Sequence, residues 1–233
     1  MIFFDNVSLE EVASVKVKDI IVGPIQYDPV SRPRAINAGA KLIRNRAASR
    51  TVTVTFSIQD DNLFSRQISV MRISKWAKTD REYKLVLPGY PDHYLMALCT
   101  EKPRPSFLEW WESELRLTFT CFDNPYWNSR TEKSAACGTD FFVAGDAPPL
   151  MRIERTVSGS SVSDQSYALD GRTITFSTIP TGNLVIDLNE QTAQIGGISI
   201  MQNYNVNSRF LIPRPGDQKI TGTGTIKYRE RWQ

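Results

Sequence analysis

The chain has 233 residues, of which 41% are hydrophobic and 23% are charged, and its formal net charge is +3. This balance is typical of a globular protein of one or two domains and excludes a disordered, collagen-like or coiled-coil chain. The longest apolar runs span only a few residues, so we expect no membrane-spanning segment, and an acid as early as Asp5 argues against a signal peptide.

The scarcity of histidine and cysteine limits the chemistry of the chain. A histidine-based triad would have to use His93, the single histidine, and a site that needs two histidines is excluded. Cys99, Cys121 and Cys137 form no CxxC pair, and their odd number argues against a disulfide framework. We therefore expect free thiols in a reducing cytoplasm, with Cys99 and Cys121 buried as small apolar groups.

The positive charge is concentrated in the first half of the chain. Residues 1–130 hold 18 Lys/Arg and 15 Asp/Glu, whereas residues 131–233 hold 10 of each. Six basic residues and no acid lie between Pro29 and Gln59, either as a solvated basic loop or as a contact surface for an acidic partner or polyanion. These residues are Arg32, Arg34, Lys41, Arg44, Arg46 and Arg50.

Two strictly alternating segments predict half-buried β-strands in the first half. In residues 51–58, Val and other apolar residues alternate with Thr and Ser, and residues 115–122 repeat the pattern. Residues 83–87 and 93–99 flank a Pro/Gly turn and predict a hairpin. Together these segments favour an antiparallel sheet or barrel.

One helix is predicted over residues 62–78. Asp60, Asp61 and Asn62 offer N-cap oxygens, and no Gly or Pro interrupts the segment. We expect an apolar stripe to lie on the sheet and the basic residues to face solvent. The stripe consists of Phe64, Ile68 and Met71, widened by Leu63, Ile73 and Trp76; the basic residues are Arg66, Arg72, Lys75 and Lys78.

Residues 28–50 show no clear period of a helix or strand and contain Pro29, Pro33 and Gly39. Compact domains seldom keep structureless loops beyond about 12–15 residues unless the loop has a function. Fully extended, this segment would reach about 75 Å, enough to leave its own domain and lie on a neighbouring one. A disordered loop is the alternative.

The second half predicts a separate β-sandwich. A Pro/Asn turn and a stretch rich in small and polar residues lie within residues 123–149. Short strand candidates separated by Gly, Pro and Asn turns follow and indicate a sandwich. We therefore divide the chain into a first domain over residues 1–130, a linker over residues 131–147 and a β-sandwich over residues 148–233.

No catalytic, metal or cofactor site is predicted. Glu109, Glu112 and Glu114 lie beside two tryptophans, as in a glycosidase pair, but a solvated turn explains them better. We do not expect an enzyme, and three other roles stay open: an assembly protein, a carbohydrate-binding module or a nucleic-acid binder. The basic stretch lacks interleaved aromatic residues, which weakens the nucleic-acid hypothesis.

The order of these features resembles the distal tail proteins of siphophages, the hubs of phage tail tips, over nearly the whole chain. The similar segments are the strand 50–58, the helix end 74–76, the hairpin 83–99, the strand 115–122 with the turn 122–127, and residues 207–232 with Pro215-Gly216 and Gly222-Thr-Gly-Thr. No one of these motifs is diagnostic, and the order and spacing carry the resemblance.

The resemblance implies a mainly β fold. Its first domain is β-barrel-like with one α-helix and forms a homohexameric ring, and its second is a galectin-like β-sandwich. Residues 28–50 match the family's extended belt, which embraces the adjacent protomer. The ring joins the tail tube protein to the tail-associated tip protein, and its lumen passes the tape measure protein and then DNA. Receptor-binding or baseplate proteins attach outside, at the tail tip of a virion or prophage product made in the bacterial cytoplasm.

Two hypotheses follow from this resemblance. The basic belt residues pair with acids of the next protomer, for which Glu10, Glu11, Asp60 and Asp61 are candidates, or some of them line the lumen and tolerate passing DNA. A carbohydrate-binding module for host recognition is the alternative function, with Tyr167 and Tyr204 as candidate sugar platforms.

Overall fold

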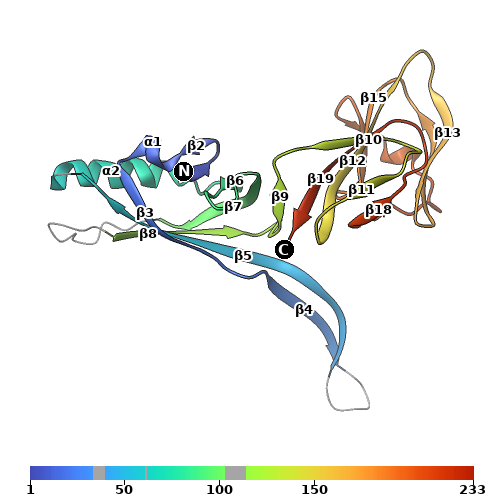
Figure 1. Ribbon diagram of the computed structural model, residues 1–233. Coiled ribbons are helices and arrows are strands. Elements are labelled where there is room, and N and C mark those ends of the chain that lie inside the picture. Colours follow the sequence, from blue (N-terminus) through green and yellow to red (C-terminus); the bar gives the residue numbers. More distant parts are fainter. Residues whose placement is uncertain (34–39, 61, 103–113) are drawn as a thin grey trace. The chain divides into compact units, whose positions relative to one another are not determined.

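The structure, a computed structural model, describes residues 1–33, 40–60, 62–102 and 114–233. It is mainly β, which confirms the predicted fold class. The chain divides into two compact units, Met1–Trp127 and Asn128–Gln233 (Figure 1). Each unit has its own packed interior.

The first unit is an antiparallel sheet with a helix on one face. Its strand order is β3-β5-β8-β7-β6-β1-β2, and the pairings among the described residues leave the sheet open at β3 and β2. The elements are β1 (Phe3–Phe4), β2 (Val7–Ser8), α1 (Leu9–Val12), β3 (Val15–Val22), β4 (Gln26–Pro33), β5 (Ala40–Ile58), α2 (Leu63–Trp76), β6 (Tyr83–Val86), β7 (His93–Glu101) and β8 (Glu114–Cys121), and β9 (Trp127–Ser129) spans the border of the units.

The predicted strands and hairpin of this unit are confirmed. In β5, Val52, Val54 and Phe56 are fully buried, and they pair with Phe119, Leu117 and Leu115 of β8. β6 and β7 pair around the Pro/Gly turn. These inward side chains form the core face of the sheet.

An aromatic cluster holds α2 against this face. The Phe4 ring lies 5.6 Å from the rings of Trp76 and Tyr83 and 5.0 Å from that of Phe119. Trp76 also meets Phe119 edge-on at 6.3 Å. Such aromatic pairs stabilise a core beyond the area that they bury.

The helix is confirmed, but the face that it buries differs from the predicted one. Asn62 caps its start, where the side-chain oxygen accepts a hydrogen bond from the Ser65 N–H at 2.8 Å. The predicted stripe is divided: Phe64 is 71% and Met71 72% exposed, whereas Ile73 and Trp76 are buried as expected, so the helix is rotated only in part from the predicted orientation. The buried residues are Arg66, Ser69, Val70, Ile73 and Trp76.

Polar contacts to the preceding turn explain this rotation of α2. Arg66 Nε donates to the Asp60 carbonyl oxygen at 2.8 Å, and Ser69 Oγ donates to the Asp60 carboxylate at 2.5 Å. These bonds keep two polar positions of the helix on the inner side. The apolar periodicity alone therefore does not identify the face that meets the sheet.

Residues 28–50, predicted as a loop without regular structure, form most of a hairpin between β4 and β5. The segment lacks a clear alternation because two register shifts interrupt the ladder, at Gln26/Tyr27 and at Val30/Ser31. Pro29 and Pro33 fit because β4 is an edge strand, where a missing N–H donor leaves no ladder bond broken.

The second unit contains one larger sheet and two small ladders. The sheet order is β10-β19-β12-β15-β16-β17, and β11 pairs with β18 and β13 with β14. The elements are β10 (Lys133–Ala136), β11 (Phe141–Val143), β12 (Ala147–Val157), β13 (Val162–Leu169), β14 (Arg172–Ile179), β15 (Gly182–Asp187), β16 (Thr192–Ile195), β17 (Ile198–Ser199), the 3₁₀ turn η1 (Met201–Asn203), β18 (Gly216–Gln218) and β19 (Thr225–Trp232).

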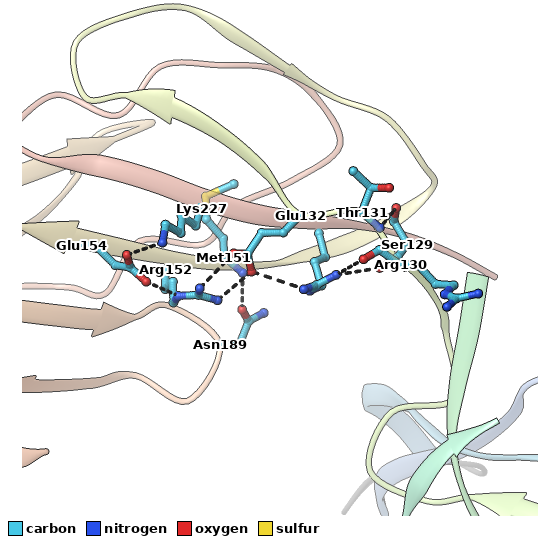
Figure 2. A network of polar contacts seen from close by, with 10 residues as sticks. Ser129, Arg130, Thr131, Glu132, Met151, Arg152, Glu154, Asn189 and Lys227 are labelled. Atoms are coloured by element: carbon cyan, nitrogen blue, oxygen red, sulfur yellow. Dashed lines mark hydrogen bonds and ion pairs between the residues drawn. The ribbon is translucent and has the colours of Figure 1, made fainter. Parts of the chain in front are cut away.

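The structure places residues 131–147 in the second unit rather than in a linker, because β10 and β11 both pair inside that unit. A polar network also connects residues 129–132, at the start of this segment, to strands β12 and β19 of the second unit (Figure 2). Arg152 donates to both carboxylate oxygens of Glu132, at 2.9 and 3.0 Å. Arg229 donates to the backbone carbonyl oxygens of Ser129 and Arg130.

Candidate assembly interface

A two-stranded arm continues from the sheet of the first unit. From Arg50 onward, β5 pairs with β8 and, from Val52, with β3, whereas residues 40–49 of β5 pair only with β4 (Figure 1). Among the described residues, the outer edges of β4 and of this part of β5 carry no further strand. Their backbone N–H and C=O groups are therefore available to another strand.

The arm is shorter than the predicted belt. Because the chain runs out along one strand and back along the other, its reach is the length of one strand. At about 3.3 Å per residue, residues 40–49 give about 30 Å. This replaces the 75 Å of a fully extended loop and still carries the arm beyond the paired sheet.

The structure places four of the six predicted basic residues on the arm. Arg32 lies on β4 opposite Lys41 of β5, and Arg44 and Arg46 are paired in register with Val30 and Asp28. Arg34 lies outside the described residues. Arg50 does not belong to the arm, since it pairs with Cys121 in the sheet and is only 5% exposed.

The candidate acidic partners differ in how free their carboxylates are. Glu10 accepts hydrogen bonds from the Ser8 hydroxyl at 2.5 Å and the Ile2 N–H at 3.3 Å. Burial raises its pKa, but these bonds, led by that from Ser8, outweigh burial and leave the pKa lowered. Asp60 binds Ser69, as described above, Glu11 is exposed, and Asp61 lies outside the described residues. Their pairing with the arm stays a prediction.

The aromatic candidates for sugar binding are not exposed platforms. Tyr167 is fully buried, and its hydroxyl donates to the Thr223 carbonyl oxygen at 3.1 Å. Tyr204 is half-buried, with its ring stacked on Phe210 at 5.3 Å and edge-on to Phe176 at 6.1 Å. Tyr167 is therefore removed from the candidates.

The thiols behave as expected from the sequence. Cys99 and Cys121 are buried, and burial raises their pKa values to about 11 and about 12. In the described part of the chain, no group of three or more His, Cys, Asp or Glu side chains is arranged to hold a metal ion. No helix within that part is long and apolar enough to cross a membrane.

The structure describes only one of the three glutamates considered as a glycosidase pair, so it gives no distance between two of them. Glu109 and Glu112 lie outside the described residues. Glu114, at the start of β8, forms an ion pair with Lys18 at 3.3 Å.

The fold is shared with proteins of phage adsorption machinery. No protein-family model matches the sequence, and no curated protein matches it. The Dit (gp 19.1) protein of phage SPP1, described as a paradigm of the hub adsorption apparatus in phages that infect Gram-positive bacteria, matches with a TM-score of 0.77 at 16% identity. This match covers 100% of the present chain and 98% of Dit. The chain therefore has the Dit fold, as the sequence resemblance implies.

A second solved structure matches less closely. A chain of the phage P2 baseplate in its activated conformation with Ca matches with a TM-score of 0.50 at 8% identity. The alignment covers 96% of the present chain and 92% of the other. The fold likeness thus extends over both units in each comparison.

Proposed function

We propose that this chain is a structural hub at the distal end of a phage tail, where six copies form a ring. The observation that carries the proposal is the fold match to the SPP1 hub protein over the whole chain, with a TM-score of 0.77. The arm supports it independently, because a hairpin with two unpaired edges is suited to contact a neighbouring copy.

The ring follows from contacts between different surfaces of identical copies. Such heterologous contacts close into a ring when the rotation between copies divides a full turn. The arm adds contact area to each neighbour without enlarging the core of its own unit. A strand of the neighbouring copy that pairs with one edge of the arm would supply main-chain hydrogen bonds. The basic residues of the arm would favour an acidic surface on that neighbour.

The remaining parts of the proposal concern partners and place. The ring joins the tail tube protein to the tail-tip protein, and its lumen passes the tape measure protein and then DNA. The second unit offers a surface for receptor-binding or baseplate proteins. This role depends on geometry and contact area and requires no catalytic group, cofactor or metal. The protein acts at the tail tip of the virion and is made in the host cytoplasm.

Negative-stain images and native mass spectrometry of the purified chain test the proposal. We expect six-fold rings with a central channel and a mass of six copies. A chain that stays monomeric at its highest soluble concentration contradicts the proposal. Tight, site-specific DNA binding also contradicts it, because a channel must release the DNA that passes.

A further inference from the structure

The outward face of α2 is apolar and cationic. Its exposed side chains include Phe64 and Met71, and Lys75 lies about one turn beyond Met71 on the same side of the helix, with Arg72 next to Met71 in the sequence. Beside it, an apolar cavity of about 470 Å³ opens between α2, α1 and the β1–β2 turn. The cavity is lined by Phe4, Asp5, Val7, Glu11, Val12, Arg72, Lys75, Trp76 and Lys78.

Two cations at this cavity have no partner of opposite charge in the described part of the chain. Lys78 is bound to Asp5 at 2.6 Å, which neutralises both. Arg72 and Lys75 are exposed, and no ion pair among the described residues includes either of them. We call these two residues the rim cations. Glu11 is the other carboxylate that lines the cavity, so the rim keeps a net positive charge.

An acidic surface surrounds the aromatic side chain of Phe122. This residue follows directly after β8, and 49% of it is exposed. The Glu82 carboxylate accepts hydrogen bonds from the Phe122 N–H at 2.5 Å and the Asp123 N–H at 3.3 Å. Glu82 and Asp123, which we call the acid pair, form no ion pair with the described residues.

The acid pair carries unneutralised negative charge. Burial is the main cause that raises the pKa of Glu82, and the nearby charge of Asp123 raises it further. The two backbone N–H bonds lower the pKa, but they do not outweigh these effects. The ionised form of Glu82 is therefore less favourable than that of a fully solvated glutamate. A cation brought by a partner would relieve this cost.

The two surfaces face opposite sides of the sheet. Leu117, Phe119 and Cys121 alternate inward along β8, and Phe119 meets Trp76 of α2. Phe122 follows Cys121 directly after the strand, and we infer from the continued alternation that it lies on the side away from α2. Tyr83 likewise contacts Phe4 on the α2 side, which turns Glu82 to the other side. Surfaces on opposite sides cannot meet within one chain, but they can meet head to tail between copies.

We propose that Phe122 of one copy inserts into the α2 cavity of the next copy in the ring. Its acid pair then meets the rim cations of that neighbour. The inference rests on the proposed function, since it names the surfaces that join the copies of the ring. An aromatic anchor in an apolar cavity with charges at its edge is the arrangement that carries most binding energy in protein interfaces.

Two variants break opposite halves of this contact. In the first, Arg72→Glu and Lys75→Glu reverse the rim cations; in the second, Phe122→Asp removes the anchor. Both change exposed side chains, so we expect each chain to fold. Each alone should lose the ring, with association weakened roughly 30-fold or more. Native mass spectrometry measures the oligomer.

Mixing the two variants gives a result that misfolding cannot produce. The first variant keeps an intact Phe122 surface and the second an intact cavity, so one sound contact remains per pair. The equimolar mixture should form a dimer of one copy of each and nothing larger. Phe142→Asp, at an exposed aromatic residue of β11 in the second unit, is the matched control and should leave the ring intact.

Glu82→Gln separates the contact from stability. The neutral amide still accepts the two N–H bonds but removes the unfavourable charge, so the dissociated chain should melt at a higher temperature while the ring weakens. If the wild type forms rings and both variants, Arg72→Glu/Lys75→Glu and Phe122→Asp, also form rings, the inference is overturned and the proposed function stands. A monomeric wild-type chain would overturn both.

Discussion

The indole N–H of Trp76 donates a hydrogen bond to the backbone carbonyl oxygen of Val7 at 3.0 Å. This bond connects the last turn of α2 to β2, which are far apart in the sequence. The same ring packs against Phe4 and Phe119. One side chain thus fixes the end of the helix over the sheet and forms a wall of the α2 cavity.

Substitutions at Trp76 should separate the hydrogen bond from the packing. Trp76→Phe keeps an aromatic ring but leaves the Val7 oxygen without this donor, and we expect a loss of about 1–3 kcal/mol in unfolding free energy. Trp76→Ala also leaves a cavity and should cost about 3–5 kcal/mol. Urea unfolding measures both. An alanine variant as stable as the wild type would show that α2 is not held by this contact.

Removal of the arm should abolish the ring and leave the first unit folded. Gln26 and Ser49 are paired in register, and Ser49 Oγ donates to the Gln26 side chain at 3.2 Å. A two-residue Asn-Gly turn can therefore replace residues 27–48 and close a tight hairpin. We expect circular dichroism and the melting temperature to stay close to those of the dissociated wild-type chain, while native mass spectrometry shows monomers. Six-membered rings of this variant would exclude the arm from assembly.

The sequence predicts those elements whose signal is local. The strands at residues 51–58 and 115–122 alternate strictly, and Asn62 is a good cap, so both the strands and the helix start are found. The buried face of α2 is predicted only in part: Ile73 and Trp76 are buried as expected, but two bonds to Asp60 also hold Arg66 and Ser69 on the inner side. The arm is missed because prolines on an edge strand look like loop residues.

The candidate surfaces could be predicted only in part. The basic character of residues 32–46 is visible in the composition, but Arg50 cannot be separated from it without the pairing of β5 and β8. The α2 cavity brings together two segments that are distant in the sequence, residues 4–12 and residues 72–78. The hydrophobic pattern of the sequence cannot predict that these segments lie together. It also cannot predict the hydrogen bond between the Glu82 carboxylate and the Phe122 N–H.

The three thiols should differ in reactivity. Cys99 and Cys121 are buried, and burial raises their pKa values to about 11 and about 12, whereas Cys137 is only half-buried, although burial raises its pKa as well. At about pH 8, a thiol reagent should modify Cys137 first and the other two only on unfolding. Peptide mass mapping after a short exposure identifies the modified residue. Early modification of Cys121 in the folded chain would contradict the buried position of β8.

Gly222 should be required by the second unit. Its φ of +131° is unfavourable for other residues, and an added Cβ would lie 2.5 Å from the Tyr167 ring. We expect Gly222→Ala to lower the unfolding free energy by about 1–3 kcal/mol from backbone strain, with a further loss from the clash. Gly89→Ala is the control, because nothing lies within 4 Å of its added Cβ. Equal melting temperatures of the two variants would contradict this packing.

The ion pairs of Glu154 should make the second unit less stable in acid. Its carboxylate binds Lys227 at 2.7 Å and Arg152 at 2.6 Å, and the bond from Lys227, followed by that from Arg152, lowers the pKa of Glu154 below its ordinary 4.5 (Figure 2). A folded-state pKa below the unfolded one contributes stability that is present above about pH 4.5 and is lost as the pH falls through the folded value.

Glu154→Gln should therefore lower the unfolding free energy by about 0.5–1 kcal/mol near neutral pH, a modest amount because solvent screens these partly exposed groups. The difference from the wild type should shrink at a second, acidic pH value below 4.5, because the carboxylate becomes protonated as the pH falls through its folded-state pKa. Urea unfolding at the two pH values measures it. Glu190→Gln, at an exposed carboxylate outside the ion pairs of the described residues, should show no such pH-dependent difference. A Glu154→Gln defect that persists unchanged in acid would instead assign the loss to packing.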